Sequence, residues 1–486
     1  MRLQDNLIPA AGSDILALYV RTQGDVSLPD GTARLSPGAV LETNTYLNAF
    51  DAGAWARYAG DLNWHLTVNV RGRCRAELVR LCAGASQVCD IREGEGELTL
   101  SPPAELVQSG VYALRLTALE AAELLSAEYC TESQPRNPEV KIGLIICTYR
   151  RLEAVQQNMA LLRQTRFFDP ADPLFGRLAV HVVDNGSELP LQAEPNFRVF
   201  HNPNTGGSGG FTRGLKEFRA IQEETRLTHV VFMDDDVEFL PESLYRLWAL
   251  LAYAVPEHTG DMVAGRMFRT DHRNVQYTAA EIWNGGDLGH VGYECDMSDP
   301  AMLETMNDNT GAEYGGWWFC CFNMAFAMVQ DPLPVFLHCD DVEYGLRHGG
   351  TPILLNGIQV WHETFEKRQT PMIRYYDTRN PLIVNAIHCP EALGEQALGR
   401  WRSLLGVRQR QADYHTEYME IRGLVDFLRG SRWLKRLDPE RNHKRLSHRR
   451  RFSRYVNMVL RRLATLLYRR RWEQAAKQYR EMGKTS

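Results

Sequence analysis

Three short apolar runs in the middle of the chain constrain the fold more than any other feature. They cover residues 141–146, 178–183 and 229–233, with helix-length segments between them. Each run has the length of a buried parallel strand and is followed at once by polar residues. This alternation predicts an α/β domain whose ligand site lies at the carboxyl ends of its strands.

The regions on either side of these runs follow other patterns. Segments 64–70 and 111–116 alternate apolar and polar residues, as half-buried strands do. From about residue 386 onward, apolar residues recur at helical spacing among arginines. We therefore predict three domains, which are a jelly-roll-like antiparallel β-sandwich over 1–138, an α/β domain over 139–385 and a basic helical domain over 386–486.

Size, composition and cysteine usage exclude several classes of protein. The chain has 486 residues, of which 44% are apolar, so a disordered or fibrous protein is excluded and more than one core can be filled. Its ten cysteines are scattered and form no C-x-x-C pair, which is typical of reduced cytosolic thiols. The first residues lack the pattern of a signal peptide, and no segment has the length and apolar character of a membrane-spanning helix.

The net charge of −5 is distributed unevenly along the chain. Residues 400–486 contain 24 Lys and Arg against 8 Asp and Glu, so this region is suited to a polyanion. Within it, segment 455–471 alternates apolar and cationic clusters in the manner of interfacial helices. We expect a cytoplasmic protein that is peripheral at the inner face of the cell membrane and binds its anionic surface. Nucleic acid, which we do not expect, and a solvated face with subunit contacts of a homo-oligomer are the alternatives.

An acidic triplet, Asp234-Asp235-Asp236, follows the third apolar run directly. Adjacent carboxylates repel one another unless a cation neutralises them. Mn²⁺ or Mg²⁺ binds through one or two carboxylates together with substrate phosphates. Asp234 and Asp236 are two residues apart and point the same way from extended backbone. An acidic turn held by water and backbone amides is the alternative, which the position after a buried strand disfavours.

A glycine-rich segment, 202–214, holds five glycines among its thirteen residues and runs into a helical pattern from Leu215. Bare backbone amides at the start of a helix are suited to a nucleotide or a phosphate. The segment matches neither the P-loop nor the dinucleotide fingerprint. A flexible surface loop is the alternative interpretation.

Three further motifs contain residues that are suited to catalysis or to ligand binding. Asp340 and Asp341 lie at a predicted helix start, where a carboxylate either caps free amides or meets an acceptor hydroxyl. Trp317 and Trp318 follow two glycines, which favours a mobile loop whose indoles face a sugar, although core packing fits the composition equally well. His362 follows an apolar run and can complete a metal site as a neutral imidazole, although a lone histidine is more often structural.

The order of these motifs resembles that of bacterial galactofuranosyltransferases of glycosyltransferase family 2, the enzymes that extend galactan chains. The resemblance spans the chain and is carried by the segments CTYRR, DNGS, NPNTGGSGGFTRG, FMDDDVEF, GGWW, HCDDVEYGLR and VWHETF. Those enzymes place a β-sandwich before a GT-A catalytic domain and a helical region after it. The resemblance therefore implies the GT-A fold for the predicted α/β domain.

The resemblance also implies roles for single residues. The family's metal ligands fall on Asp234, Asp236 and His362, and the family uses Mn²⁺ or Mg²⁺. Its general base, the second aspartate of a D-D-x-E motif, falls on Asp341. The implied nucleotide contacts are Thr148, Arg150, Asp184, Asn204, Arg213 and Asp235, and the implied acceptor contacts are Trp317, Trp318, Asp340 and Glu343.

The activity that the resemblance implies is an inverting transfer of galactofuranose from UDP-galactofuranose to a hydroxyl of a glycan or lipid-linked glycan, by metal-assisted direct displacement. Motifs for the diphosphate do not identify the sugar. A family 2 transferase using UDP-galactose, UDP-glucose or dTDP-rhamnose is therefore the first alternative. A non-catalytic glycan-binding scaffold is the second, and the intact set of carboxylates argues against it.

Overall fold

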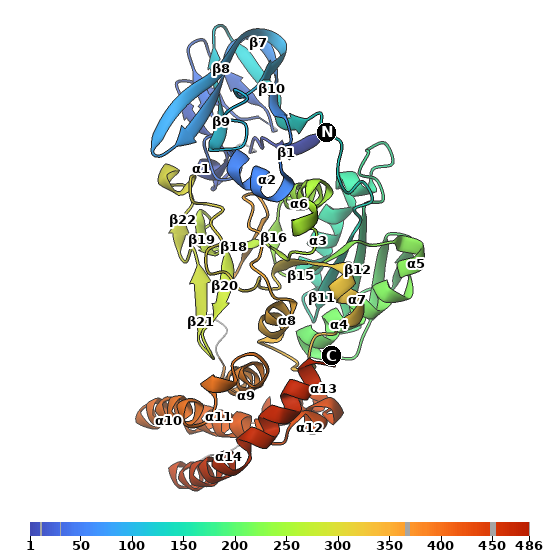
Figure 1. The fold of residues 1–486 in the computed structure, drawn as a ribbon, viewed down its shortest axis with the longest axis vertical. Coiled ribbons are helices and arrows are strands. Elements are labelled where there is room, and N and C mark those ends of the chain that lie inside the picture. The colour runs from blue at the N-terminus through green and yellow to red at the C-terminus, as the bar shows by residue number, and fades with distance from the viewer. Residues whose placement is uncertain (10–11, 30, 365–369, 448–452, 486) are drawn as a thin grey trace.

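The computed structural model describes residues 1–9, 12–29, 31–364, 370–447 and 453–485. Figure 1 shows three regions stacked along the long axis of the molecule. An antiparallel sheet occupies the N-terminal end, an α/β region the middle and a group of helices the C-terminal end.

The N-terminal region contains ten strands that all pair antiparallel. The long strand β7 (Trp64–Cys82) pairs with β8 (Ala85–Leu100) along most of its length. On its other side β7 pairs first with β10 (Ala122–Thr131) and then with β9 (Val111–Ala118). The change of partner falls beside Gly72, whose φ of +83° is easily adopted only by glycine. The remaining elements are β1 (Arg2–Asp5), β2 (Arg21–Gln23), β3 (Val26–Ser27), β4 (Ala33–Leu35), β5 (Val40–Glu42), β6 (Phe50–Asp51), α1 (Leu16–Tyr19) and α2 (Ala52–Ala59).

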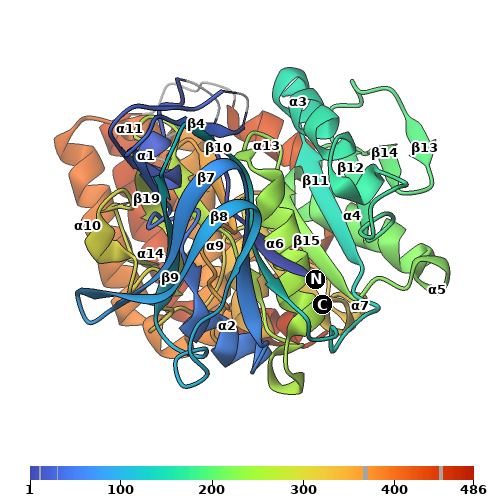
Figure 2. The ribbon, with the colours of Figure 1, turned by 90° about the horizontal axis from the view of Figure 1, so that it is seen from above.

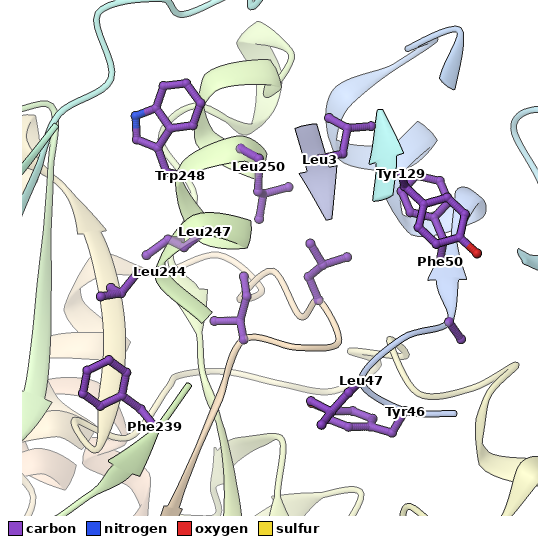
Figure 3. Packing of buried hydrophobic residues seen from close by; sticks show 14 of the residues in the cluster. Leu3, Tyr46, Leu47, Phe50, Tyr129, Phe239, Leu244, Leu247, Trp248 and Leu250 are labelled. Atoms are coloured by element: carbon purple, nitrogen blue, oxygen red, sulfur yellow. The ribbon is translucent and has the colours of Figure 1, made fainter. Parts of the chain in front are cut away.

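The core of this sheet continues into the α/β region. Phe50 and Tyr129 stack with ring centroids 4.6 Å apart, and they belong to the same buried cluster as Leu247 and Trp248 of α6 (Pro241–Tyr253) (Figure 3). Buried Arg246 of α6 donates to the carbonyl of Leu47 at 3.0 Å. The N-terminal region is therefore packed against the α/β region through a shared apolar and polar interface.

The central sheet confirms the three strands predicted from the apolar runs. They are β11 (Ile142–Thr148), β12 (Leu178–Asp184) and β15 (His229–Asp234), which pair parallel with β11 in the middle. The seven-stranded sheet has the order β13-β14-β12-β11-β15-β23-β17. Its other strands are β13 (Gln192–Glu194), β14 (Phe197–His201), β17 (Val263–Ala264) and β23 (Phe319–Asn323).

Helices cover both faces of this sheet. Leu144 and Val182 face a cluster that includes α3 (Leu152–Arg163) and α6, whereas Ile145 faces a cluster that includes α4 (Gly206–Ala220). Figure 2 shows α6 and α4 on the two sides of β11 and β15. The shorter helices of this region are α5 (Gln222–Thr225), α7 (Met324–Val329) and α8 (Asp340–His348).

A smaller five-stranded sheet has the order β16-β24-β18-β19-β22. Its strands are β16 (Glu238–Phe239), β24 (Gln359–His362), β18 (Arg266–Arg269), β19 (Val275–Thr278) and β22 (Cys295–Asp296). A separate hairpin is formed by β20 (Ala280–Trp283) and β21 (Leu288–Val291).

The C-terminal region is helical, as predicted, but it begins earlier than residue 386. Helix α9 (Pro371–His388) runs through the predicted domain boundary at 385/386, and the division into three domains stays a prediction. The α-helices that follow among the described residues are α10 (Glu395–Arg410), α11 (Tyr414–Phe427), α12 (Ser431–Arg436), α13 (Pro439–Ser447) and α14 (Arg454–Gly483). Within the part of the chain that the structure describes, no helix is both long enough and apolar enough to span a membrane.

Candidate metal centre and active site

The three residues predicted to bind a metal converge at one edge of the central sheet. Asp234 ends β15, Asp236 lies in the turn that follows, and His362 ends β24. The His362 Nε2 atom lies 3.3 Å from an Asp236 carboxylate oxygen and 3.8 Å from an Asp234 carboxylate oxygen. One ligand atom from each of the three residues lies within 4.8 Å of the other two.

Strand pairing explains this convergence. Strand β16 begins two residues after Asp236 and pairs antiparallel with β24, with Glu238 opposite Trp361. His362 is the next residue along β24, so the pairing brings its ring beside the acidic turn. A residue that is distant in sequence thereby completes a site begun by the triplet.

The electrostatics of the cluster favour a bound cation. The pKa of Asp234 is raised to about 7, mainly by desolvation and also by the carboxylates of Asp236 and Asp235, against the lowering effect of His362 and Arg151. Desolvation also raises the pKa of Asp235. Two carboxylates and one imidazole are a donor set suited to Mn²⁺ or Mg²⁺, and Mn²⁺ accepts the nitrogen more readily. The residues present therefore fit the predicted metal.

Arg151 is a site residue that the sequence analysis missed. Its Nη1 atom lies 3.1 Å from Asp235 Oδ1 and also contacts the Asp236 carboxylate. The predicted neighbour, Arg150, is instead 68% exposed, with its Nε 4.0 Å from Glu188. Arg150 has a left-handed φ of 59°, and this turn of the backbone decides which arginine faces the triplet.

The predicted nucleotide residues Thr148 and Asp184 lie side by side at the ends of β11 and β12. The Asp184 carboxylate accepts hydrogen bonds from the backbone amides of Gly186, Glu188 and Leu189 at 2.6–2.7 Å. These bonds fix the turn after β12. A direct contact of Asp184 with a nucleotide stays a prediction.

Most of the glycine-rich segment forms helix, which begins at Gly206 rather than near Leu215, and the segment is not the flexible surface loop of the alternative interpretation. Helix α4 starts at Gly206, where Asn204 Oδ1 accepts from the Gly206 amide at 3.1 Å. A Cβ at Gly210 would lie 2.0 Å from Cys147 Sγ, and one at Gly214 would lie 2.4 Å from Ile145 Cγ2. These glycines are therefore required for close packing of α4 on β11. The glycine content of the sequence did not distinguish this packing role from a role in binding phosphate.

The first turn of α4 nevertheless faces the acidic residues of α8. A Cβ at Gly207 would lie 3.2 Å from Asp340 Oδ2. Free amides at a helix start are suited to an anion. Arg213, predicted to contact the nucleotide, lies further along α4, where its Nε donates to Glu217 at 2.7 Å.

Asp340 and Asp341 begin α8, as predicted. Desolvation raises the pKa of Asp341, whose Oδ1 accepts from the Val342 amide at 2.8 Å. Desolvation and then the Asp341 charge raise the pKa of Asp340 to about 7. The turn before them contains Phe336, His338 and Cys339, which have left-handed φ values of 79°, 63° and 61°.

The structure contradicts the acceptor contact predicted for Glu343. Glu343 is fully buried, with Arg347 Nη2 at 2.8 Å and His388 Nε2 at 3.3 Å from its carboxylate. These contacts tie α8 to α9. Because both carboxylate oxygens are engaged inside the protein, Glu343 is a structural residue.

The structure also contradicts the mobile loop predicted for Trp317 and Trp318. Their exposed fractions are 5% and 4%. Trp317 packs edge-to-face on Phe232 with centroids 4.8 Å apart, and Trp318 Nε1 donates to the Gly265 carbonyl at 2.8 Å. A Cβ at Gly316 would lie 2.2 Å from the Trp318 ring, so the glycine allows packing rather than motion. Both indoles are therefore part of the packed core.

Glu281 is a second residue that the sequence analysis missed. It is buried in β20 opposite His290 of β21, whose Nδ1 lies 2.6 Å from its carboxylate. The pKa of Glu281 is raised to about 7, mainly by desolvation, with a contribution from the charge of Asp341 and against the lowering effect of His290. The turn sequence 284–287, Asn-Gly-Gly-Asp, predicts a hairpin that would have paired these two residues.

Comparison with known proteins gives matches along most of the chain. Residues 144–303 match the family described as glycosyl transferase family 2. The galactofuranosyltransferase GlfT2 of Mycobacterium tuberculosis is 27% identical over an alignment of 453 positions that covers 82% of this chain and 66% of that protein. GlfT2 of Mycolicibacterium smegmatis is 25% identical over an alignment of 477 positions that covers 87% of this chain and 70% of that protein.

The chain therefore spans 66% to 70% of the length of these two relatives. Among solved structures, a mannosyltransferase from Pyrobaculum calidifontis, in complex with GDP-Man and Mn²⁺, is 11% identical. That match covers 72% of this chain and 90% of the other with a TM-score of 0.32, which is too low to assign a shared fold.

Proposed function

We propose that this chain is a glycosyltransferase that transfers galactofuranose from UDP-galactofuranose to a glycan hydroxyl, because residues 144–303 match glycosyl transferase family 2 and two relatives are named galactofuranosyltransferases. The central sheet with its helices is accordingly a GT-A domain. The observation that carries the catalytic proposal is the cluster of Asp234, Asp236 and His362 at the strand ends. The choice of sugar rests on the names of the relatives.

Asp234, Asp236 and His362 would hold a divalent cation. Such a cation, when bound, stabilises the negative charge that develops on the diphosphate as the glycosidic bond breaks. Arg151 orients the triplet by contacting both Asp235 and Asp236. The first amides of α4, beside Asp340, are suited to the diphosphate oxygens. These groups together would bind the departing side of the donor.

Asp341 is our candidate for the general base. In direct displacement, the acceptor oxygen forms a bond to the anomeric carbon while the bond to UDP breaks, and an ionised carboxylate takes the hydroxyl proton. Burial raises the pKa of Asp341, which makes its ionised form a stronger base than an exposed aspartate. Buried Glu281, whose pKa responds to the Asp341 charge, is our candidate for the acceptor side.

We further propose that α14 meets an anionic membrane surface. Leu463, Leu466 and Leu467 are 52%, 54% and 40% exposed. Arg461, Arg462 and Arg469 lie in the same part of the helix. A helix that presents apolar and cationic side chains together is typical of an interfacial segment. Such binding would hold the enzyme at the inner face of the cell membrane, and a homo-oligomer stays an alternative use of this surface.

A donor panel tests the proposed reaction. The protein is incubated with a galactofuranose oligosaccharide as acceptor and with one of four donors, which are UDP-galactofuranose, UDP-galactose, UDP-glucose and dTDP-rhamnose. The release of nucleoside diphosphate is measured with and without Mn²⁺. We expect the fastest release from UDP-galactofuranose and its loss without the metal or in Asp236→Ala. Faster release from another donor would contradict the choice of sugar. No metal-stimulated release from any donor would favour the scaffold.

A further inference from the structure

A cavity of about 520 Å³ lies between the outer face of α4 and the helical region. Its walls come from α4, the segment 331–336, α9 and the corner between α12 and α13. The glycines of α4 that pack on β11 lie on the opposite side of that helix. The cavity is therefore distinct from the sheet edge that carries Asp234, Asp236 and His362.

The charged residues that line this cavity are mostly cationic. Arg213, Lys216, Arg379 and Lys435 line it, against the single acid Asp331. The Asp331 carboxylate lies 2.5 Å from Arg219, which is outside the lining, and 3.9 Å from Lys216. The charge of Asp331 is thus already compensated from outside, as that of Arg213 is by Glu217 at 2.7 Å, and Lys216, Arg379 and Lys435 leave the cavity with an excess of positive charge.

Arg379 is the most informative of these residues because it is only 1% exposed. Its N–H groups donate to Asn380 Oδ1, the Tyr375 hydroxyl and the Val335 carbonyl, all of which are neutral. Among the residues that the structure describes, no carboxylate lies within 4.0 Å of its guanidinium. Buried charges in proteins are usually paired.

The nearest hydrogen-bonded route from Arg379 to a carboxylate does not remove this excess. The Tyr375 hydroxyl donates to Asp426 at 3.0 Å. Asp426, however, is already paired with Arg422 at 2.9 Å and with Arg429 at 3.5 Å. The single carboxylate of Asp426 is therefore shared by the guanidinium groups of Arg422, Arg429 and, through Tyr375, Arg379. It cannot neutralise all three, so positive charge remains uncompensated behind the cavity wall.

We propose that this cavity binds a phosphate-bearing anion at a site separate from that of the donor. The exposed Lys216 and Lys435 supply charged donors in the lining, and buried Arg379 supplies positive charge in the wall. The Thr205 hydroxyl accepts from Asn202 at 3.0 Å and keeps its own proton for a ligand oxygen. The ligand is either a free phosphate compound or a lipid headgroup.

Inorganic pyrophosphate is the probe for the free anion. It is titrated calorimetrically into the full chain in buffer freed of divalent cations. Lys216→Glu and Lys435→Glu reverse one charge each in the lining, and Lys477→Glu makes the same change on an exposed position of α14 outside it. We expect each lining variant to weaken binding by about tenfold or more and the control to leave it nearly unchanged.

Equal weakening by all three variants, or no binding to the wild type, would overturn the proposal. Asp234→Ala, which removes a predicted metal ligand, should leave pyrophosphate binding intact. A change of affinity in that variant would assign the binding to the donor site and contradict a separate one. These readouts do not use turnover, so their outcome is independent of the proposed transfer reaction.

Vesicles of phosphatidylcholine with and without phosphatidic acid distinguish the two sources of the phosphate group. If the natural ligand is a headgroup, Lys435→Glu should lose binding to phosphatidic acid vesicles as well as to pyrophosphate. If only pyrophosphate binding is lost, the ligand is a free anion. Unfolding temperatures of all variants check that these exposed lysines can be replaced without loss of the fold.

Discussion

Asp341 is the single residue whose side-chain chemistry the proposed reaction needs most directly. Replacing it by asparagine keeps its size and removes the proton acceptor. We expect Asp341→Asn to lower turnover by about 10² to 10⁴-fold, the usual contribution of a general base, while Mn²⁺-dependent UDP binding is retained. Steady-state rates and calorimetric titration of UDP measure the two effects.

Asp413→Asn, at the start of α11, is the control for a change of one carboxylate to an amide. It should leave both quantities nearly unchanged. If Asp341→Asn lost UDP binding together with turnover, the residue would belong to the donor site. Unchanged turnover would remove Asp341 from the role of base.

His181 gives a prediction for the pH dependence of stability. It is buried in β12, where its ring stacks on Phe218 with centroids 3.6 Å apart, and burial lowers its pKa to about 3. In the unfolded chain, His181 takes up a proton near the ordinary histidine pKa of about 6.5, whereas in the folded chain its imidazole stays neutral. Stability should therefore fall by about 1.4 kcal/mol per pH unit for this group as pH drops below about 6.5.

Urea unfolding at several pH values tests this expectation. His181→Phe removes the titrating group while keeping an aromatic ring against Phe218, so its free energy of unfolding should fall less steeply with decreasing pH than that of the wild type. His229, whose pKa burial lowers to about 4, remains in both proteins. Identical slopes would show that His181 does not titrate as its burial requires.

Among single residues, the sequence predicted those whose role follows from local spacing. The pair Asp234 and Asp236 was recognisable from the strand before it, and His362 from the resemblance. Arg151 was not, because the left-handed backbone at Arg150 reverses the expected direction of the two side chains. Glu343 was misassigned because its burial depends on α9, which approaches α8 only in the folded chain.

The turn that precedes α8 is the element on which the position of the proposed base depends. Three of its residues have left-handed backbone, a conformation that costs roughly 1–3 kcal/mol each for residues other than glycine. Buried Asn380 of α9 donates to the carbonyls of Leu337 at 2.6 Å and His338 at 2.8 Å. Helix α9 thereby holds the strained turn that leads into Asp340 and Asp341.

Asn380→Asp removes these two donors without changing the size of the side chain. We expect turnover to fall by about 10²-fold, since misplacement of a reacting group by about 1 Å has this effect, with UDP affinity nearly unchanged. Hydrogen exchange should become faster in the turn 336–341. Asn385→Asp, an equally buried change in α9 without a bond to the turn, is the control. Equal losses of turnover in both variants would show that Asn380 has only a general structural role.

Strands were easier to predict than the boundaries of helices. The apolar runs of β11, β12 and β15 are long and uniform, so the presence of three buried parallel strands followed from the pattern. The start of α4 did not, because glycines disfavour a helix locally and are present here for packing on Cys147 and Ile145. The β20–β21 hairpin differs from α4 in this respect, because its turn sequence Asn-Gly-Gly-Asp is itself a hairpin signal.

The whole molecule places its basic helical end opposite the N-terminal sheet (Figure 1). The N-terminal sheet shares a buried cluster with the α/β region, whereas the α14 side chains Leu463, Leu466 and Leu467 remain exposed. Composition indicated the excess of positive charge in this region. It could not indicate which face of α14 packs on other helices, because that depends on contacts between α14 and α11.

The exposed apolar and cationic side chains of α14 lead to a prediction about how the whole molecule binds membranes. We expect the protein to float with vesicles that contain phosphatidylglycerol and not with neutral phosphatidylcholine vesicles, and the bound fraction to fall as salt rises. Leu463→Glu should lower it, because this change places charge in the exposed apolar stripe. Val88→Glu, at an exposed position of β8, is the control. Equal flotation with neutral vesicles would contradict an electrostatic contribution.

The central claim is that Asp234, Asp236 and His362 jointly bind the cation that meets the diphosphate. Crystals grown with UDP and Mn²⁺, measured at the manganese absorption edge, test it most directly. The account predicts an anomalous difference peak in contact with these three side chains and with the diphosphate oxygens. A peak elsewhere, or UDP bound at this sheet edge without a peak, would contradict it.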